Sequence, residues 1–295
     1  MNALLHVSSQ QLFAQLLIGL IYGAFYALMS LGLAVIFGML HIVNFAHGAF
    51  FMVGAFAAYL LLHVLGVGYW WALILAPLIV GALGAVAERA LIRRIAGLDH
   101  LYGLLLTFGL AITVQGLFQA YFGSSGLPYP IPPELSGGTT LGFMVLPNYR
   151  VWVIGFSAFV CLATWLAVEK TKLGALLRAA TENPGLVRAF GVDVPRMITL
   201  TYAFGVALAA LAGVLAAPIT QVRPAMGADL ISVVFAVVVV GGMGSILGSI
   251  VTGFALGLLE GLTKVFYPEA SNTVIFAIMA VVLVIRPTGL FGRAA

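Results

Sequence analysis

The sequence contains few charged residues. Asp, Glu, Lys and Arg make up 7% of its 295 residues, whereas 63% are hydrophobic and the mean hydropathy is +1.16. So few charges cannot cover the surface of a soluble protein, and the backbone of an apolar segment is satisfied in lipid most simply by a helix. We therefore expect an all-α integral membrane protein. The net charge of +4 belongs to that setting and gives no indication of nucleic-acid binding.

Motifs on which enzymes depend are also missing. The one cysteine, Cys161, has no second sulfur for a disulfide and no metal-ligand spacing around it, so we interpret it as a packing residue. The sequence has no GxxxxGK[ST] phosphate loop, no HExxH and no GxSxG nucleophile elbow. It therefore offers no catalytic residues and no metal ligands, which disfavours a membrane enzyme. Any ATP that drives this protein is then bound by another chain.

Apolar runs recur along the whole chain, and a membrane-spanning helix needs about 20 residues. The runs lie at residues 12–39, 46–65, 70–92, 101–122, 151–168, 197–218, 230–242, 246–266 and 274–285. They predict a polytopic helical bundle of about eight or nine spans with broken or re-entrant segments. The run at 230–242 is short and stops at Gly-Gly-Met-Gly-Ser, which predicts a break that is covered by protein. No polar stretch reaches the roughly 50 residues of a soluble domain, so residues 1–295 are expected to form a single transmembrane domain.

Basic residues indicate the side on which each loop lies, because cytoplasmic loops carry an excess of Lys and Arg. Three arginines lie within residues 89–94, and Arg286 and Arg293 lie near the end of the chain. We therefore expect the C-terminus in the cytoplasm. The loop at 123–149 is rich in Pro and Gly and has no Lys or Arg, so it is expected outside, as is the N-terminus if there are nine crossings.

Charged residues gather in one segment. Residues 169–196 hold eight of the 22 Asp, Glu, Lys and Arg residues, so this segment is predicted to be a structured cytoplasmic loop. Within it, the sequence predicts a short helix with Asn183 as N-cap, Pro184 in the first turn and Gly191 as the C-terminal stop.

One face of this short helix is apolar. Leu186, Val187 and Phe190 are expected to share it because of their i, i+3 and i+4 spacing. A helix of two turns is not stable alone in water, so this face needs a cover. Two alternatives remain open: the face folds back on the chain's own helix ends, or it docks in a groove on a soluble subunit.

Polar side chains interrupt the apolar runs at two places. His41, Asn44 and His47 recur at three-residue spacing, roughly on one helix face, and such groups avoid lipid. They line a translocation path or form hydrogen bonds between helices. Thr107 and Gln115 are eight residues apart on nearly the same helix face. They are candidates for the same path, although Thr107 can also bond to its own helix backbone.

The second half of the chain carries an intramembrane acid and a series of glycines. Glu260 is a functional candidate because acids are rare in apolar runs, but Lys264 follows at i+4 and can neutralise it, which favours a structural pair. The glycines at GxxxG spacing predict close helix packing. They are Gly244, Gly248, Gly253, Gly257 and Gly261.

Several segments, taken together, resemble the permease subunits of ABC importers for branched-chain amino acids, the LivH-type family. They are GLIYGAFYAL at 19–28, VNFAHG at 43–48, RA at 178–179 with EN at 182–183 and AFGV at 189–192, AGVL at 212–215, and RPTGLFG at 286–292. The resemblance extends over nearly the whole chain. It implies that the loop at 169–196 docks the ATPase, although this loop lacks the fuller Glu-Ala-Ala lettering of other ABC importers. The residues that this implies for coupling are Arg178, Glu182, Asn183, Leu186, Val187, Arg188, Phe190 and Gly191.

The resemblance also implies an assembly in a bacterial-type cytoplasmic (inner) membrane. Its partners are a second, homologous permease, two cytoplasmic ATPase subunits that bind ATP and Mg, and an extracytoplasmic solute-binding protein, while this chain binds no cofactor. Substrates within the family extend from leucine, isoleucine and valine to other amino acids, amides and urea. The alternative of an ion-coupled secondary transporter would require intramembrane charges as a relay, for which Glu260 is the candidate.

Overall fold

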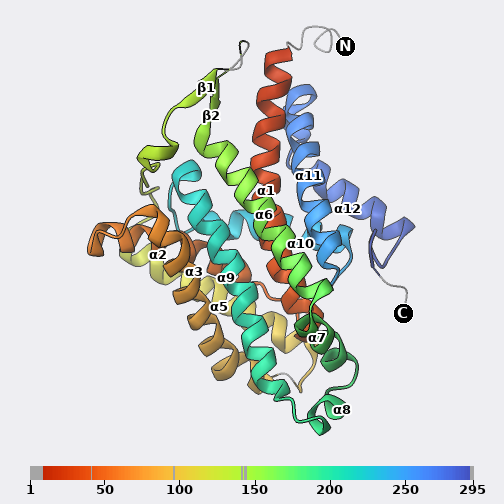
Figure 1. The fold of residues 1–295 in the computed structure, drawn as a ribbon. Coiled ribbons are helices and arrows are strands. Elements are labelled where there is room, and N and C mark those ends of the chain that lie inside the picture. The colour runs from red at the N-terminus through yellow and green to blue at the C-terminus, as the bar shows by residue number, and fades with distance from the viewer. Residues whose placement is uncertain (1–8, 41, 96, 141, 143–144, 293–295) are drawn as a thin grey trace. The chain divides into compact units, whose positions relative to one another are not determined.

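The protein is helical over most of its length in the computed structural model, which describes residues 9–40, 42–95, 97–140, 142 and 145–292 (Figure 1). Among these residues, seven helical stretches are long and apolar enough to cross a membrane. They are Ser9–Leu40 (α1), Ala46–Leu65 (α2), Tyr69–Ile95, His100–Phe122 (α5), Asn148–Lys170 (α6), Val194–Thr220 (α9) and Ile246–Phe266 (α11). The stretch Tyr69–Ile95 joins α3 (Tyr69–Ala87), the π-helical turn η2 (Glu88–Ile92) and α4 (Arg93–Ile95).

Two further apolar helices are shorter, namely α10 (Met226–Gly241) and α12 (Val274–Ile285). Together with the seven long stretches they confirm a polytopic helical membrane bundle. The helix α10 ends where the sequence predicted a break. Gly242 and Gly244 follow with φ angles of 100° and 83°, which glycine adopts without the steric penalty of a side chain.

The remaining elements are short. They are α7 (Lys172–Glu182), α8 (Pro184–Ala189), the 3-10 turns η3 (Pro133–Leu135) and η4 (Pro268–Ala270), and the strands β1 (Gly138–Thr140) and β2 (Val145–Pro147). The two strands pair antiparallel, with Gly138 opposite Pro147. Contacts within the chain gather into two compact units. The first unit comprises Met1–Ser30, Ile131–Cys161 and Val233–Ala295, and the second comprises Leu31–Pro130 and Leu162–Ser232.

Glycines bring α1 and α11 together in the first unit. A Cβ atom added to Gly19 would lie 2.5 Å from the carbonyl oxygen of Gly257, and one added to Gly253 would lie 2.6 Å from Cα of Ala27. Gly261 faces α1 in the same way, so the predicted close packing is confirmed for these three glycines of α11. Gly244, in contrast, lies in the turn before α11 and not on the helix.

The C-terminal segment closes the open end of α10 in the same unit. The amides of Leu290 and Phe291 donate to the carbonyls of Val240 and Gly241 at 2.8 and 3.1 Å. The last carbonyls of a helix have no partner within the helix, and apolar surroundings make an unsatisfied carbonyl unfavourable. The segment that follows α12 thus supplies what the end of α10 lacks.

In the second unit, α9 packs along both α2 and α3. Small residues again line the contact: a Cβ atom added to Gly54 would lie 2.7 Å from the carbonyl carbon of Ala210, and one added to Gly81 would lie 3.1 Å from the carbonyl oxygen of Ala203. Close backbone approach therefore fixes α9 between two other helices.

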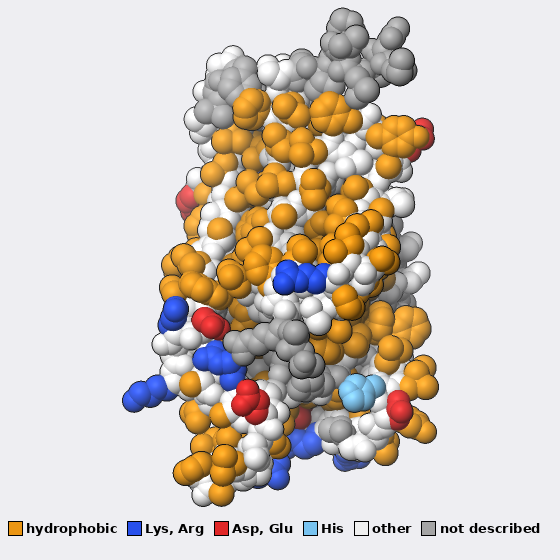
Figure 2. Space-filling view, turned by 90° about the vertical axis from the view of Figure 1, so that its right-hand side faces the viewer, with side chains coloured by type: hydrophobic (Ala, Val, Ile, Leu, Met, Phe, Trp, Pro, Cys, Tyr) orange, Lys and Arg blue, Asp and Glu red, His pale blue; other side chains and the backbone are white. Residues whose placement is uncertain are grey.

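Large hydrophobic side chains remain exposed on many helices. Leu78, Leu117, Phe159 and Val284 are 63, 65, 65 and 86% exposed. Figure 2 shows one face of the molecule on which many hydrophobic side chains lie at the surface, above a lower part that carries most of the charged side chains in view. A water-soluble protein rarely exposes so many large apolar side chains, whereas lipid tails cover them without penalty.

Two alanine substitutions should test the glycine packing with opposite results. Gly253→Ala places a methyl group against the backbone of Ala27 and should destabilise the protein by about 1–3 kcal/mol, the usual range for overpacking. Gly109 in α5 has no atom within 4 Å of its added Cβ, so Gly109→Ala should be neutral or stabilising by about 0.5–1 kcal/mol. Thermal unfolding in detergent measures both. Equal stability of the two variants would contradict the glycine contact between α1 and α11.

Candidate functional site

The charged segment at 169–196 folds into α7, α8 and the start of α9. The side chain of Asn183 accepts a hydrogen bond from the amide of Leu186 at 2.9 Å, and Pro184 is the first residue of α8. Gly191 follows the helix with a φ of 82°. The short helix, its N-cap and its glycine stop are therefore confirmed as predicted.

The apolar residues of α8 divide between two sides. Val187 is buried, and it forms a small core with Ala180 of α7 and Val194 of α9. Leu186 and Phe190, in contrast, are 55 and 79% exposed. The expectation that Leu186, Val187 and Phe190 share one face is therefore wrong for Val187. Adjacent helical residues point about 100° apart, and Phe190 lies just beyond the last helical residue of α8.

Contacts with the end of α6 fix α7. The guanidinium of Arg178 donates to the carbonyl of Val168 at 2.9 Å and lies 3.5 Å from the carboxylate of Glu169. Gly174 faces the same Val168 carbonyl, with no room for a Cβ atom between them. Arg178, which the family resemblance implies for coupling, thus holds α7 in place. Glu182 and Arg188 remain exposed.

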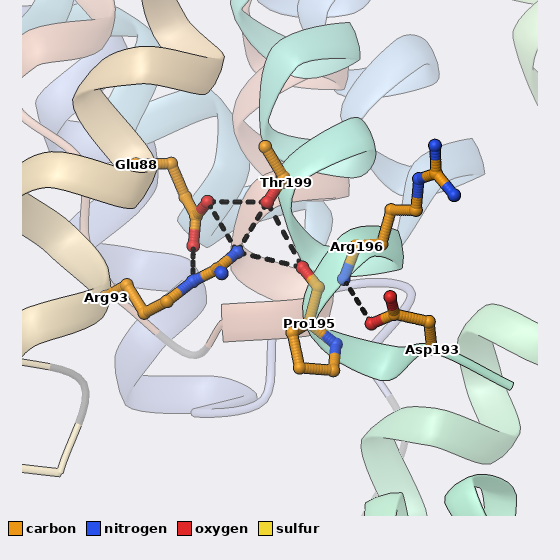
Figure 3. Close-up of polar contacts among 6 residues, drawn as sticks. All are labelled: Glu88, Arg93, Asp193, Pro195, Arg196 and Thr199. Carbon is orange, nitrogen blue, oxygen red and sulfur yellow. Dashed lines mark hydrogen bonds and ion pairs between the residues drawn. The ribbon is translucent and has the colours of Figure 1, made fainter.

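An ionic cluster around a buried carboxylate lies directly beside the start of α9 (Figure 3). Glu88, in the first position of η2, is 1% exposed. Its two carboxylate oxygens accept hydrogen bonds from Nε and Nη2 of Arg93 at 3.1 and 3.0 Å, and the hydroxyl of Thr199 donates to Oε2 at 2.7 Å. The paired arrangement satisfies a carboxylate that would be very unfavourable alone in this position.

The same arginine reaches the backbone of α9. Nη2 of Arg93 donates to the carbonyl of Pro195 at 2.9 Å, and Asp193 caps the helix by accepting from the amide of Arg196 at 3.0 Å (Figure 3). Glu88 was not among the residues expected from the sequence, because Arg93 served there only as a marker of the cytoplasmic side. A carboxylate at the end of an apolar run, five residues before an arginine, was the available signal.

Of the polar residues predicted for a translocation path, two meet at the break between α1 and α2. Asn44 is buried, and its Nδ2 donates to the hydroxyl of Tyr202 in α9 at 3.0 Å, while its Oδ1 has no hydrogen-bond partner among the described residues. The hydroxyl of Thr107 accepts from the amide of Phe45 at 3.2 Å and lies 3.2 Å from the carbonyl of Val43. Both side chains therefore hold the irregular backbone at 42–45 against the neighbouring helices.

Of the two histidines predicted for the path, one lies within the described residues. His47 is fully buried, and a Cβ atom added to Gly32 of α1 would lie 3.1 Å from its ring. His41 lies outside the described residues. His47 is thus packed within the second unit, where Gly32 of α1 faces Gly205 of α9.

Gln115 lies in a pocket between the first turn of α2, the middle of α5 and the start of α10. Among the described residues that line this pocket, Gln115 has the one polar side chain. Its apolar walls include Phe45, Met52, Phe108, Ile112 and Ile231. Thr107 belongs to the same helix but points to the break at 42–45 and not into the pocket.

The predicted pair in α11 forms. Nζ of Lys264 lies 2.6 Å from Oε1 of Glu260, and the hydroxyl of Tyr26 donates to Oε2 at 2.7 Å. The ammonium group also lies 5.0 Å from the centre of the Tyr22 ring, within the range of a cation–π contact. These contacts give Glu260 a structural role in joining α11 to α1. Within the described part of the chain, no three His, Cys, Asp or Glu residues are placed to hold a metal ion.

Comparison with known proteins gives this arrangement a context. The family model for the permease component of branched-chain amino acid transport systems matches residues 15–283. The high-affinity branched-chain amino acid transport system permease protein LivH of Escherichia coli (strain K12) is 28% identical over 95% of both chains, and BraD of Pseudomonas aeruginosa, with the same description, is 29% identical over 95% of both.

A second type of permease is also similar. LivM of Escherichia coli (strain K12), described as a high-affinity branched-chain amino acid transport system permease protein, is 28% identical over 90% of this chain and 67% of LivM. No solved structure matches the chain significantly. Because the family model covers most of the sequence, the chain belongs to the family of permease components of branched-chain amino acid transport systems.

Proposed function

We propose that this chain is the membrane-spanning permease subunit of an ATP-driven ABC importer for branched-chain amino acids. The observation that carries the proposal is the exposed apolar surface of the α7–α8 segment. Leu173, Leu186 and Phe190 are 72, 55 and 79% exposed on an element that is capped, charged and tied to its neighbours. A charged segment lies in water, and a rigid apolar patch in water is typical of a docking surface.

The partner that fits this surface is a cytoplasmic ATPase subunit with an apolar groove. Helix-in-groove docking uses a few apolar anchors on a preformed element, and Leu186 in α8 and Phe190 at its C-terminal end offer such anchors. ATP and Mg would be bound on two such subunits. The similarity to both LivH and LivM supports a second, homologous permease as a further partner, and a solute-binding protein would deliver the substrate.

An ion-coupled secondary transporter is the competing function. It would need intramembrane acids that are free to take up and release an ion. The two buried acids in the described residues are instead each held by a cation and a hydroxyl: Glu88 by Arg93 and Thr199, and Glu260 by Lys264 and Tyr26. Uptake into vesicles that requires internal ATP and persists after the ion gradients collapse separates the two functions. Competition by leucine but not by urea separates the amino-acid substrate from the amide and urea substrates of other members.

We further propose that the translocation path passes Gln115. The pocket around this side chain is apolar except for its amide, which suits a solute with a branched aliphatic side chain and polar ends. Asn44, His47 and Thr107 would support the wall of this path, since they are buried beside the irregular segment that leads into α2.

The docking surface can be tested with aspartates at its two anchors. Leu186→Asp and Phe190→Asp should leave the protein inserted but reduce co-purification of the ATPase subunits about tenfold or more, because an unpaired charge cannot enter an apolar groove. Tyr267→Asp serves as the control, because Tyr267 is 61% exposed in a different turn. Normal co-purification and transport by a variant with both aspartates would show that α8 is not the docking element.

The loop at 123–149 has no Lys or Arg and the loop at 169–196 has several, so we place the first outside and the second in the cytoplasm. The C-terminus is then also cytoplasmic, in a bacterial-type inner membrane. In a Cys161→Ala background, Ser136→Cys should react with an impermeant thiol reagent from outside, and Arg188→Cys only from inside. Both positions are exposed, so access through the protein does not limit the reaction. Labelling of both cysteines from outside would overturn this topology.

The path is tested by two glutamines of the same helix. Gln115→Leu should lower import per assembled complex about fivefold, which corresponds to one hydrogen bond of roughly 1 kcal/mol. Gln119→Leu makes the same chemical change at an exposed position outside the pocket and should leave import unchanged. Import must be normalised to the amount of assembled complex. Equal effects of the two substitutions would remove Gln115 from the path.

A further inference from the structure

The ionic cluster at the end of α3 joins two helices through one guanidinium group. Arg93 binds the carboxylate of Glu88 on its own helical stretch and the carbonyl of Pro195 in the first turn of α9. Thr199, one turn further along α9, completes the cluster from the other side. A planar guanidinium can hold a carboxylate with two donors and still reach a carbonyl, which an ammonium group cannot do in the same geometry.

Packed side chains connect this cluster to the α7–α8 segment, which is the proposed docking element. Val187 of α8 and Val194 of α9 share one small buried core, and Pro195 follows Val194 directly. A displacement of α8 therefore reaches the first turn of α9 through packed side chains. From Pro195 it reaches Arg93 and Glu88 through hydrogen bonds of ordinary length (Figure 3).

Stability alone does not explain an ionic cluster at this place. The Glu88 side chain is 1% exposed but the Arg93 side chain is 40% exposed. An ion pair whose cation reaches water adds little to stability, so packing would hold α3 to α9 without it. The carboxylate stands instead at the start of a π-helical turn, Glu88–Ile92, a local irregularity that is frequent at functional sites. Directional bonds to this turn fix the register of two helices that could otherwise slide along their small side chains.

We propose that Glu88 and Arg93 are positioning residues that transmit movement of the α7–α8 segment to the membrane-spanning helices α3 and α9. This inference rests on the proposed function, because it assigns to the docking segment the task of receiving force from an ATPase. The pair makes α3 and the start of α9 move as one body. Thr199 and the Pro195 carbonyl are the points at which α9 is held.

The test uses the full complex, reconstituted in proteoliposomes with its ATPase subunits and solute-binding protein. The variant with both Glu88→Gln and Arg93→Met removes both charges, so that the buried carboxylate of Glu88 is not left without its cation. Arg94→Met is the matched control, since Arg94 is the adjacent arginine, is exposed, and has no hydrogen bond or ion pair within the described chain. Import of leucine, basal ATP hydrolysis and its stimulation by loaded binding protein are measured for each.

The double variant should assemble and hydrolyse ATP at the basal rate, but import per ATP should fall about fivefold or more, the lower end of the usual coupling between two sites. A merely structural pair predicts normal import per ATP in whatever complex assembles. Coupling equal to that of Arg94→Met would therefore overturn the proposal. If the wild-type complex itself shows no ATP-dependent import, the proposed function fails and not the role of this pair.

If the double variant does not assemble, substitutions at Thr199 test whether the Glu88–Arg93 pair couples ATP hydrolysis to import. Thr199→Val keeps both charges and the shape but removes the hydroxyl that binds Glu88, so it should assemble and lose coupling in part. Thr199→Ser keeps the hydroxyl and should restore coupling to the wild-type value. Equal coupling in Thr199→Val and Thr199→Ser would then refute the proposal.

Discussion

Hydrocarbon offers no hydrogen bonds, so this chain must supply a partner for nearly every polar group that its apolar helices carry. Glu260 has Lys264 and Tyr26, and the hydroxyl of Ser30 lies 3.1 Å from the carbonyl of Ser249. The hydroxyl of Thr252 lies 3.1 Å from the carbonyl of Val237 in α10. Each of these groups has one partner on its own helix and another on a neighbouring helix. The need for hydrogen-bond partners therefore also joins particular helices.

The second consequence of an apolar solvent is that apolar side chains gain little by leaving it. Helices in lipid associate through close packing and hydrogen bonds, since tails of lipid are as apolar as leucine. This explains why the contacts between α1 and α11, and between α9 and its neighbours, are lined by glycine and alanine. It also explains why leucine and phenylalanine side chains remain on the outside in such numbers. In a soluble protein the large apolar side chains fill the core, whereas here many of them lie outside and small residues line the helix contacts.

Features that depend on neighbours in sequence were predictable. The Asn183 cap, the Gly191 stop and the Glu260–Lys264 pair each follow from residues within one helix or its ends, and the structure has all three. The burial of Val187 was not predictable, because it depends on how α8 lies against α7 and α9. The bond from Thr199 to Glu88 joins residues 111 positions apart, and no local pattern indicates such a partner.

Under the proposed function, the α7–α8 segment has two opposite requirements, and these explain its mixed composition. A surface that receives an ATPase must expose apolar anchors to water, whereas the base of the segment must hold a fixed position on the membrane helices. Leu186 and Phe190 meet the first requirement, while Val187 with Val194 and the bond from Arg178 to Val168 meet the second. A permease that is driven by a separate ATPase subunit needs a docking element with a rigid base. In the proposed coupling, the bonds from Arg93 to Pro195 and Glu88 connect that rigid base to the end of α3.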